Sequence, residues 1–282
     1  MNTFNAKILS NEEVAEKIFR LTVDAPELAK NSRAGQFVQV KISDEFTLRR
    51  PLGIASTAGG TVKIFYRVVG RGTEKLSTKQ AGETLNILGA LGNGYSNFGG
   101  KILLVGGGMG MAPLLCAAIA ASPAVSSELL AISDTPANLT ANSYQLTARV
   151  ATQADVLLGG RTKDEVIFWQ EEFRPYVGKI FITTDDGSYA KKGFAIDLLP
   201  EVFSAENYSA ILTCGPEVMM RGVAKFAAEK NIPCEVSFEK RMACGLGACL
   251  SCSIDTVDGR KKVCKDGPVF DARKVFGGET LE

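Results

Sequence analysis

Cys244-Gly245-Leu246-Gly247-Ala248-Cys249-Leu250-Ser251-Cys252 is a glycine-rich turn that carries three of the seven cysteines of this 282-residue chain. A fourth cysteine, Cys264, follows a predicted hairpin, because strand-forming residues at 253–257 and 261–263 flank the turn signal Asp258-Gly259. The spacing C-x4-C-x2-C with one further sulfur is that of plant-type 2Fe–2S ligands. The small residues let backbone N–H groups approach the cluster sulfurs. We therefore predict an electron carrier whose 2Fe–2S cluster is held by Cys244, Cys249, Cys252 and Cys264.

Other uses of these cysteines stay open. A structural zinc site also takes four thiolates, although zinc sites more often pair two C-x2-C halves. Free thiols are a further reading. Disulfides fit poorly, because the cysteine count is odd and no secretory signal is seen, so a reducing, cytoplasmic compartment is the simplest expectation. The chain has no histidine, which excludes a Rieske centre, a haem with a His ligand and a Ser-His-Asp triad.

The charge balance and hydropathy of the chain limit the kinds of partner that it can bind. With 32 basic and 31 acidic residues the chain is almost neutral, so we expect neither nucleic-acid binding nor a polybasic membrane anchor. Residues 102–121 are mostly apolar, but the glycines at 106–108 and 110 and Pro113 divide them. We read this stretch as a buried strand, a tight turn and an apolar helix, and not as a membrane span.

Three segments with different patterns follow one another. Residues 1–99 contain strand-like runs at 37–42, 61–69 and 84–88 separated by glycine-rich turns, which predicts a small antiparallel β-barrel. In residues 100–236, strands predicted at 101–105, 154–158, 179–183, 209–213 and 233–237 alternate with helices, which predicts an α/β doubly wound parallel sheet with an inserted element at about 122–152. Residues 237–282 form a small cluster module.

Two short segments are candidates for nucleotide binding. The turn Gly106–Gly110 follows a predicted strand and precedes a helix, so its N–H groups could hold a pyrophosphate. Cys214-Gly215-Pro216 follows a later strand and should lie at the same carboxyl edge of the sheet. A tight turn without a ligand is the simpler alternative for the first segment.

Together these motifs resemble the ferredoxin–NADP reductase superfamily, and more narrowly the electron-transfer subunits of class 1B dihydroorotate dehydrogenase. Leu48–Ile54 is similar to the family's R-P-x-S flavin motif, Tyr66–Thr73 to a second flavin segment, and Leu88–Tyr95 to a third. The stretch Phe238–Cys249 is similar to the family's cluster loop. Gly53 stands where the family usually has Ser, and Ala90 replaces a Pro.

The resemblance implies three cofactors, FAD, a 2Fe–2S cluster and NAD(H), and assigns residues to each. FAD would be bound by Arg50, Pro51, Leu52, Gly53, Phe65, Tyr66, Arg67, Gly72 and Thr73. NAD(H) would be bound by Gly106, Gly107, Gly108, Gly110, Cys214, Gly215 and Pro216, with Cys214 near the nicotinamide as the catalytic candidate.

The resemblance also implies the activity and the partner. Electrons would pass between the FMN of a dihydroorotate dehydrogenase catalytic subunit and NAD+, in pyrimidine biosynthesis and within a heterotetramer of two copies of each chain. Leu246 and Leu250 would dock the partner, unless they pack under the hairpin. An alternative is the small subunit of an NADH-dependent ferredoxin:NADP oxidoreductase, a sulfide dehydrogenase-like protein or another NAD(P)H diaphorase, where a non-cysteine cluster ligand is expected. A zinc-stabilised nucleotide-binding adaptor is an alternative of another class.

Overall fold

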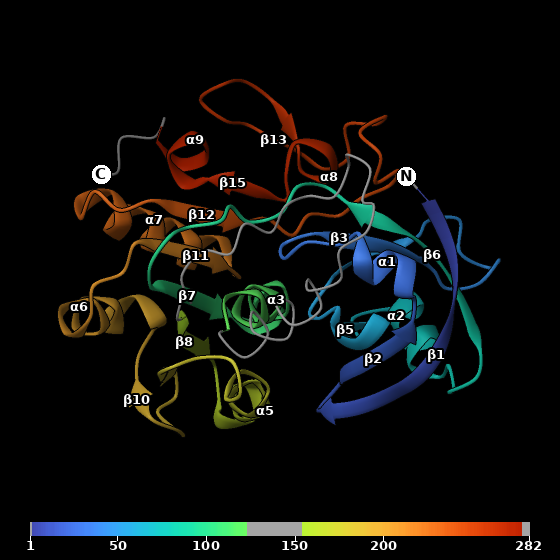
Figure 1. The fold of residues 1–282 in the computed structure, drawn as a ribbon, viewed down its shortest axis with the longest axis horizontal. Coiled ribbons are helices and arrows are strands. Elements are labelled where there is room, and N and C mark those ends of the chain that lie inside the picture. The colour runs from blue at the N-terminus through green and yellow to red at the C-terminus, as the bar shows by residue number, and fades with distance from the viewer. Residues whose placement is uncertain (1, 123–153, 278–282) are drawn as a thin grey trace, which may run out of the picture.

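The computed structural model describes residues 2–122 and 154–277 of the chain. Two sheets lie side by side, and the C-terminal residues, red in Figure 1, lie along one edge of the molecule beside both. We call residues 2–99 the barrel, the described part of residues 100–236 the nucleotide domain, and residues 237–277 the cluster module. The insertion predicted at about 122–152 lies outside the described residues except for Ser122.

The barrel is a six-stranded antiparallel sheet with the order β4-β3-β6-β1-β2-β5. A bridge between Ser56, just after β4, and Lys63 of β5 brings the two edges together. Alternate side chains of β6, such as Leu85 and Ile87, point into the core, as the sequence pattern predicts. Its strands are β1 (Asn2–Ala15), β2 (Ile18–Asp24), β3 (Phe37–Lys41), β4 (Arg50–Gly53), β5 (Thr61–Arg67) and β6 (Thr84–Leu91), with helices α1 (Pro26–Lys30) and α2 (Arg71–Ser77) and the 3-10 turn η1 (Ala58–Gly60) between them.

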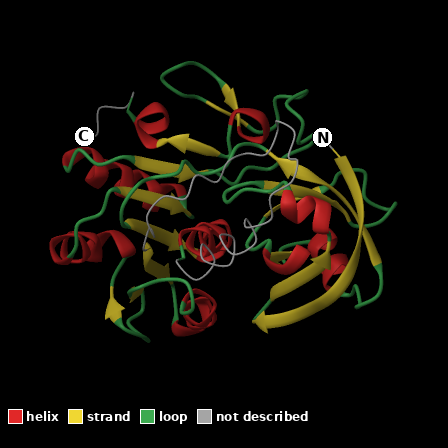
Figure 2. Ribbon diagram, viewed as in Figure 1, coloured by secondary structure: helices red, strands yellow, loops and turns green. Residues whose placement is uncertain are grey.

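The nucleotide domain is built on a seven-stranded sheet with the order β10-β9-β8-β7-β11-β12-β15, parallel except for β15. Helices cover both faces (Figure 2), so the central strand β7 is buried throughout and reads as a continuous apolar run. The strands are β7 (Ile102–Gly107), β8 (Ala154–Gly160), β9 (Ile180–Thr184), β10 (Lys191–Lys192), β11 (Ala210–Cys214) and β12 (Cys234–Ser237). The helices are α3 (Met111–Ala121), α5 (Lys163–Phe173), α6 (Ala195–Ala205) and α7 (Glu217–Glu229), and a 3-10 turn η2 (Gly108–Gly110) joins β7 to α3.

The five strands predicted for this domain are confirmed, with boundaries shifted by a few residues. The apolar residues 102–121 divide into β7, η2 and α3, as expected from their glycines. Within the described ranges, no helix combines the length and the apolar character needed to cross a bilayer.

The cluster module is continuous with the nucleotide domain. It contains a short hairpin of β13 (Ser253–Ile254) and β14 (Lys261–Lys262), helices α8 (Val263–Asp266) and α9 (Ala272–Phe276), and strand β15 (Val269–Asp271). β15 pairs antiparallel with β12 and so extends the sheet beyond residue 236. Phe238, Cys252 and Val263 share one apolar core with Val236. A module this small gains buried area by joining the neighbouring core, which the sequence pattern did not predict.

Candidate functional site

A cavity of about 360 Å3 lies where the barrel, the nucleotide domain and the cluster module meet. The barrel lines it with residues of β4, β5 and α2; the nucleotide domain adds Met109 of η2 and Ala112 and Pro113 from the first turn of α3. The end of β12 and the segment that follows it add residues 237–240 and Met242. Eight of the predicted FAD residues line this cavity, namely Arg50, Pro51, Leu52, Gly53, Phe65, Tyr66, Arg67 and Thr73.

The ninth predicted FAD residue, Gly72, lies directly against the Arg50 side chain. A Cβ atom at position 72 would lie 2.4 Å from Nε of Arg50, so only glycine allows the guanidinium to lie on this turn of α2. Arg50 forms no ion pair with any carboxylate of the described residues; its guanidinium lies over the Phe46 ring and donates to the Leu48 carbonyl. A cation held in this way at a cavity wall suits a phosphate ligand.

The neighbouring Arg49 has a structural role. Its guanidinium donates to the carbonyls of Gln39 and Asn86, at 3.2 and 3.0 Å, and also to the Asn86 side chain. Arg49 therefore ties β3 to β6, and of the two consecutive arginines only Arg50 faces the cavity.

Three other predicted FAD residues use their side chains within the protein. The Thr73 hydroxyl accepts hydrogen bonds from the N–H groups of Val69 and Gly70 at 2.9 and 3.3 Å. The Tyr66 hydroxyl donates to Asn11 at 2.9 Å, and the Phe65 ring lies 4.8 Å from the ring of Trp169. Because these side chains are engaged with other protein groups, we infer that they shape the cavity wall.

Gly53 has room for the side chain that the family usually carries. A Cβ atom at this position would meet Pro113 at 3.6 Å, which is ordinary van der Waals contact. The neighbours of residue 53 therefore leave room for a Cβ atom, and the cavity does not require glycine here.

The predicted NAD(H) residues gather at the carboxyl ends of β7 and β11. The chain runs outward from β7 through β8 to β10 and then returns to the other side of β7 as β11, which makes this edge a topological switch point. Gly110 packs directly on the backbone of Cys214, where an added Cβ would lie 2.4 Å away, and Gly107 similarly faces Pro216. None of the seven lines the main cavity, but Met109 of the same turn does.

Cys214 is fully buried at the end of β11, and burial raises the pKa of its thiol well above the usual range. A neutral, enclosed thiol can contact a ligand but does not act as a nucleophile. Its predicted position near the nicotinamide stays a prediction.

The four cysteines of the cluster loop come together in two pairs. The Sγ atoms of Cys244 and Cys249 are 3.3 Å apart. Cys252 and Cys264 face each other from the start and end of the hairpin, where the Cys264 N–H donates to the Cys252 sulfur at 3.5 Å. Within residues 2–122 and 154–277, no three ligating side chains converge on a single ion. The grouping by pairs suits two irons that take two thiolates each better than one tetrahedral zinc.

Backbone donors surround these sulfurs. The N–H groups of Leu246 and Cys249 both donate to the Cys244 sulfur at 3.4 Å, and Gly247 donates to Cys264 at 3.1 Å. The hydrogen bonds from Leu246 and Cys249 lower the pKa of the Cys244 thiol to about 6. Gly245 and Gly247 both have positive φ, which lets the turn direct its N–H groups inward. The donor set therefore suits an anionic sulfur cluster.

A short connection links the cavity to the cluster loop. Met242 lines the cavity and is only two residues from Cys244. Gln39 of β3 is fully buried beside both, with its amide nitrogen 3.9 Å from the Met242 sulfur and close against Gly245. The wall of the cavity and the ligand loop are thus one continuous segment.

The segment Leu88–Tyr95, which is similar to a third flavin motif, contacts the cluster module. Its residues are not among those that line the cavity, and its implied contact with FAD stays a prediction. The Asn93 amide donates to the carbonyls of Asp266 and Val269 at 3.0 and 3.1 Å and accepts from the Val269 N–H at 3.1 Å. A Cβ at Gly92 would lie 2.5 Å from the Gly267 carbonyl oxygen. This glycine and asparagine hold the module in place.

We expect Asn93→Ala to loosen the cluster module without changing the flavin cavity. The change removes three hydrogen bonds, which costs about 1–3 kcal/mol of stability. Hydrogen–deuterium exchange of residues 266–271 should accelerate, whereas FAD content should stay normal. Asn97→Ala serves as the control, because Asn97 is an exposed asparagine in the same connection between β6 and β7. Equal exchange in the two variants would contradict this role for Asn93.

Glu239 is a cavity residue that the sequence analysis missed. It follows β12, so it lies near the switch-point edge, and its side chain faces the cavity. Glu239 is exposed to solvent as a whole residue, but protein atoms crowd its carboxyl, and this desolvation raises its pKa. The one local sign is a charged residue two positions after a strand that ends at the ligand edge, and this sign alone does not distinguish Glu239 from an ordinary surface carboxylate.

This raised pKa gives a pH dependence with a defined sign. The folded protein binds the Glu239 proton more tightly than the unfolded chain does, so the contribution to stability is fully present below the ordinary pKa of 4.5 and is lost as the pH rises through the folded pKa. Glu239→Gln should flatten this part of the profile of unfolding free energy against pH, measured by denaturant titration of the FAD-free protein. Glu229→Gln, at an exposed position of α7, should leave the profile unchanged.

Comparison with known proteins agrees with this geometry. Residues 239–276 match the family described as the iron-sulfur cluster binding domain of dihydroorotate dehydrogenase B. The "Dihydroorotate dehydrogenase B (NAD(+)), electron transfer subunit" of Clostridium perfringens is 34% identical over 277 residues, covering 98% of each chain. The chain belongs to this family of electron transfer subunits. Another dihydroorotate dehydrogenase B electron transfer subunit, from Lysinibacillus sphaericus, is 38% identical over 276 residues, 94% of this chain and 95% of its own.

Solved structures relate this dihydroorotate dehydrogenase B family fold to flavin reductases. A chain from the structure of an NADH-dependent reduced ferredoxin-NADP oxidoreductase, described for flavin-based electron bifurcation, has a TM-score of 0.78 and 28% identity, covering 97% of this chain and 90% of its own. A ferredoxin NADP+ reductase from Neisseria gonorrhoeae has a TM-score of 0.61 at 16% identity, covering 81% and 92%. The second likeness concerns the fold alone. The predicted resemblance and the predicted barrel, doubly wound sheet and iron–sulfur module are confirmed.

Proposed function

We propose that this chain passes electrons between a dihydroorotate dehydrogenase catalytic subunit and NAD+ through a 2Fe–2S cluster and FAD, in pyrimidine biosynthesis. One observation carries the proposal: a single segment, residues 237–252, forms a wall of the candidate FAD cavity and then supplies three of the four cluster cysteines. Such continuity supports the proposal, because an electron acceptor held by this loop would lie close to a flavin bound in the cavity.

The residues divide the task of holding the cofactors. Arg50, over Gly72, would neutralise the FAD pyrophosphate, and β4 and β5 would lie along the rest of the molecule. The loops after β7 and β11 would hold NAD(H) at the switch point. When bound, FAD exchanges two electrons with a nicotinamide and single electrons with an iron–sulfur cluster, so the protein need supply only orientation and electrostatics.

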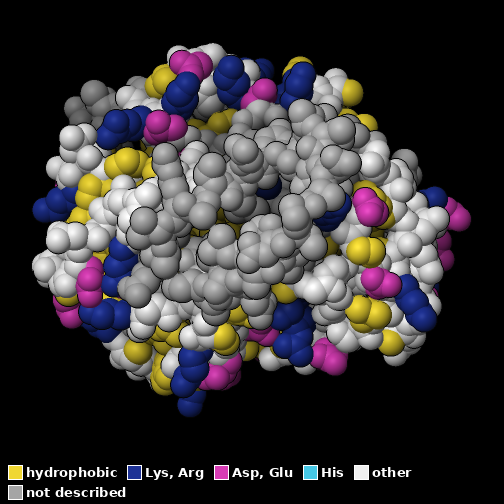
Figure 3. Space-filling model, in the orientation of Figure 1, with side chains coloured by type: hydrophobic (Ala, Val, Ile, Leu, Met, Phe, Trp, Pro, Cys, Tyr) yellow, Lys and Arg dark blue, Asp and Glu magenta, His cyan; other side chains and the backbone are white. Residues whose placement is uncertain are grey.

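The proposed partner surface is the outer side of the cluster loop. Leu246 and Leu250 have 44% and 64% of their surface exposed, next to Cys244 and Cys249, which are half-buried. Where Figure 3 shows described side chains, Lys and Arg are interspersed with Asp and Glu. We expect apolar contact through Leu246 and Leu250 to contribute to docking. The partner would be an FMN-containing catalytic subunit, in a heterotetramer of two copies of each chain.

Co-expression with that subunit tests the proposal. The purified complex should contain FAD, iron and FMN, and should reduce NAD+ when dihydroorotate is supplied. The isolated chain should show flavin bands together with broad absorption at longer wavelength. Anaerobically prepared protein without stoichiometric iron, even after reconstitution, would refute the proposal.

A second candidate function is that of a small subunit of an NADH-dependent ferredoxin:NADP oxidoreductase. The TM-score of 0.78 to that structure favours it. The four paired cysteines favour the first proposal, because a non-cysteine ligand is expected in the second. Reduction of NADP+ by reduced ferredoxin, without any dihydroorotate activity, would select the second.

A further inference from the structure

Two matched rows of side chains face each other between the barrel and the nucleotide domain. Alternate residues of β5, namely Lys63, Phe65 and Arg67, point to one side of the strand. On α5, Glu165, Trp169 and Glu172 recur at spacings of four and three residues, which places them on one side of the helix. We call these six residues the α5–β5 seam.

The rows pair in antiparallel order, with charges at both ends and aromatic rings in the middle. Glu172 accepts from Lys63 at 3.3 Å, and the ring of Trp169 lies 4.8 Å from that of Phe65. Glu165 accepts from Arg67 at 3.5 Å. Three residues on one side of the strand thus contact three residues on one side of the helix.

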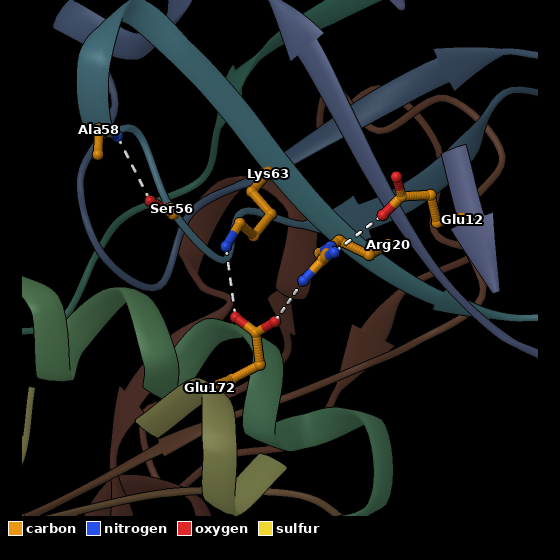
Figure 4. A network of polar contacts seen from close by, with 6 residues as sticks. All are labelled: Glu12, Arg20, Ser56, Ala58, Lys63 and Glu172. Atoms are coloured by element: carbon orange, nitrogen blue, oxygen red, sulfur yellow. Dashed lines mark hydrogen bonds and ion pairs between the residues drawn. The ribbon is translucent and has the colours of Figure 1, made fainter. Parts of the chain in front are cut away.

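Neighbouring cations reinforce both ends of the seam. The other carboxylate oxygen of Glu172 accepts from Arg20 of β2 at 2.9 Å, and Arg20 also pairs with Glu12 (Figure 4). At the opposite end, Glu165 also accepts from the Arg161 side chain. Each carboxylate therefore bridges two cations, and Glu172 binds two strands of the barrel to one helix.

The seam is partly shielded from water. The side chains of Glu165 and Glu172 are only 16% and 15% exposed, and Trp169 is 1% exposed. Phe65 and Trp169 belong to one apolar core that also contains Leu114 of α3. Charge pairs at the rim of such a core keep a fixed geometry better than pairs on an open surface do.

The position of the seam gives it a consequence for the cavity. Phe65 and Arg67 line the cavity from the barrel side, while α5 begins just after β8, whose end lies beside β7 at the switch-point edge. The proposed sites for FAD and NAD(H) belong to two domains that this seam joins. The seam is therefore one of the contacts on which the separation of the two sites depends.

We propose that Glu172 and Trp169 are positioning residues, which hold the nucleotide domain at the distance from the barrel that reduction of bound FAD by NADH requires. This inference rests on the function proposed above and deepens it. It assigns to the α5–β5 seam a role in the NAD(H) half of the reaction, and no role in the cluster half.

The variant Glu172→Lys tests the inference, because it places a third cation against Lys63 and Arg20. In stopped-flow experiments, the reduction of bound FAD by NADH should be slower by about tenfold or more, since small misplacements of reactants carry large kinetic penalties. Hydrogen–deuterium exchange in β5 and α5 should increase, whereas FAD content, the iron–sulfur spectrum and reduction of the cluster from the partner side should stay normal.

Glu171→Lys is the matched control. It makes the same charge change one position earlier on α5, where the side chain is 64% exposed and pairs with Arg174 of the same chain segment. This variant should behave as the wild type does. If Glu172→Lys matched Glu171→Lys in both the NADH rate and hydrogen exchange, the inference would be overturned.

A double-mutant cycle keeps the test informative if Glu172→Lys does not fold. Lys63→Gln and Glu172→Gln should each slow the reduction of FAD by NADH, and the double variant should be no slower than the worse single variant. Fully additive effects would overturn the inference. If the wild-type FAD were not reduced by NADH at all, the proposed function itself would fail, which is a separate outcome.

Discussion

Replacing Cys249 by serine should abolish the iron–sulfur absorption and stop electron delivery to the partner. Cys249 supplies one thiolate of the pair with Cys244, and its own N–H donates to the Cys244 sulfur. A serine oxygen is a poor ligand for iron in this setting, so we expect throughput to the partner to fall by more than about 100-fold. The cavity is formed by other residues, so NADH should still reduce the bound FAD.

The neighbouring Ser251→Ala is the control for this experiment. Ser251 is exposed, and its hydroxyl makes only a 3.4 Å contact with the Arg241 carbonyl among the described residues. The control should keep the full visible spectrum and normal throughput. Normal throughput in Cys249→Ser would show that Cys249 is not a ligand.

Replacing Arg50 by glutamine should release FAD. Among the described residues this guanidinium has no carboxylate partner, and it lines the cavity above Gly72. Loss of charge-assisted hydrogen bonds to a phosphate costs about 2–3 kcal/mol, which corresponds to a roughly 30- to 150-fold weaker Kd for FAD. Fluorescence titration of the FAD-free protein measures this constant directly.

Arg49→Gln provides the contrast, because that guanidinium ties β3 to β6 and faces away from the cavity. It should lower the thermal midpoint and leave the Kd for FAD almost unchanged. Gly72→Ala should act like Arg50→Gln, since the added Cβ displaces the guanidinium. An unchanged Kd in Arg50→Gln would assign the pyrophosphate to another cation.

Patterns local in the sequence predicted much of this molecule. Strands could be predicted from the apolar run at 102–107 and from the alternation in 84–91, and a cluster site from the cysteine spacing. Each of these patterns involves residues that are close together in the chain. Gly72, which the resemblance assigns to FAD, lies against the Arg50 side chain, and its role in FAD binding stays a prediction.

Other features depend on contacts between segments that are distant in the chain, so no local sequence pattern predicts them. Glu239 reads as an ordinary charged residue until the cavity forms around it. Asn93 lies within a motif similar to a flavin segment, yet its amide binds a backbone that is more than 170 residues away. Strand β15 has only three residues, too few for alternation to stand out.

The pairing of β15 with β12 has a consequence for any truncated form of this protein. A shortened protein that ended at residue 236 would leave the N–H and C=O groups of β12 without the partner that Val269–Asp271 now provides. Open strands of this kind recruit other molecules and promote aggregation. A soluble NADH-binding fragment would therefore need to keep the C-terminal strand, even if its iron-binding cysteines were replaced.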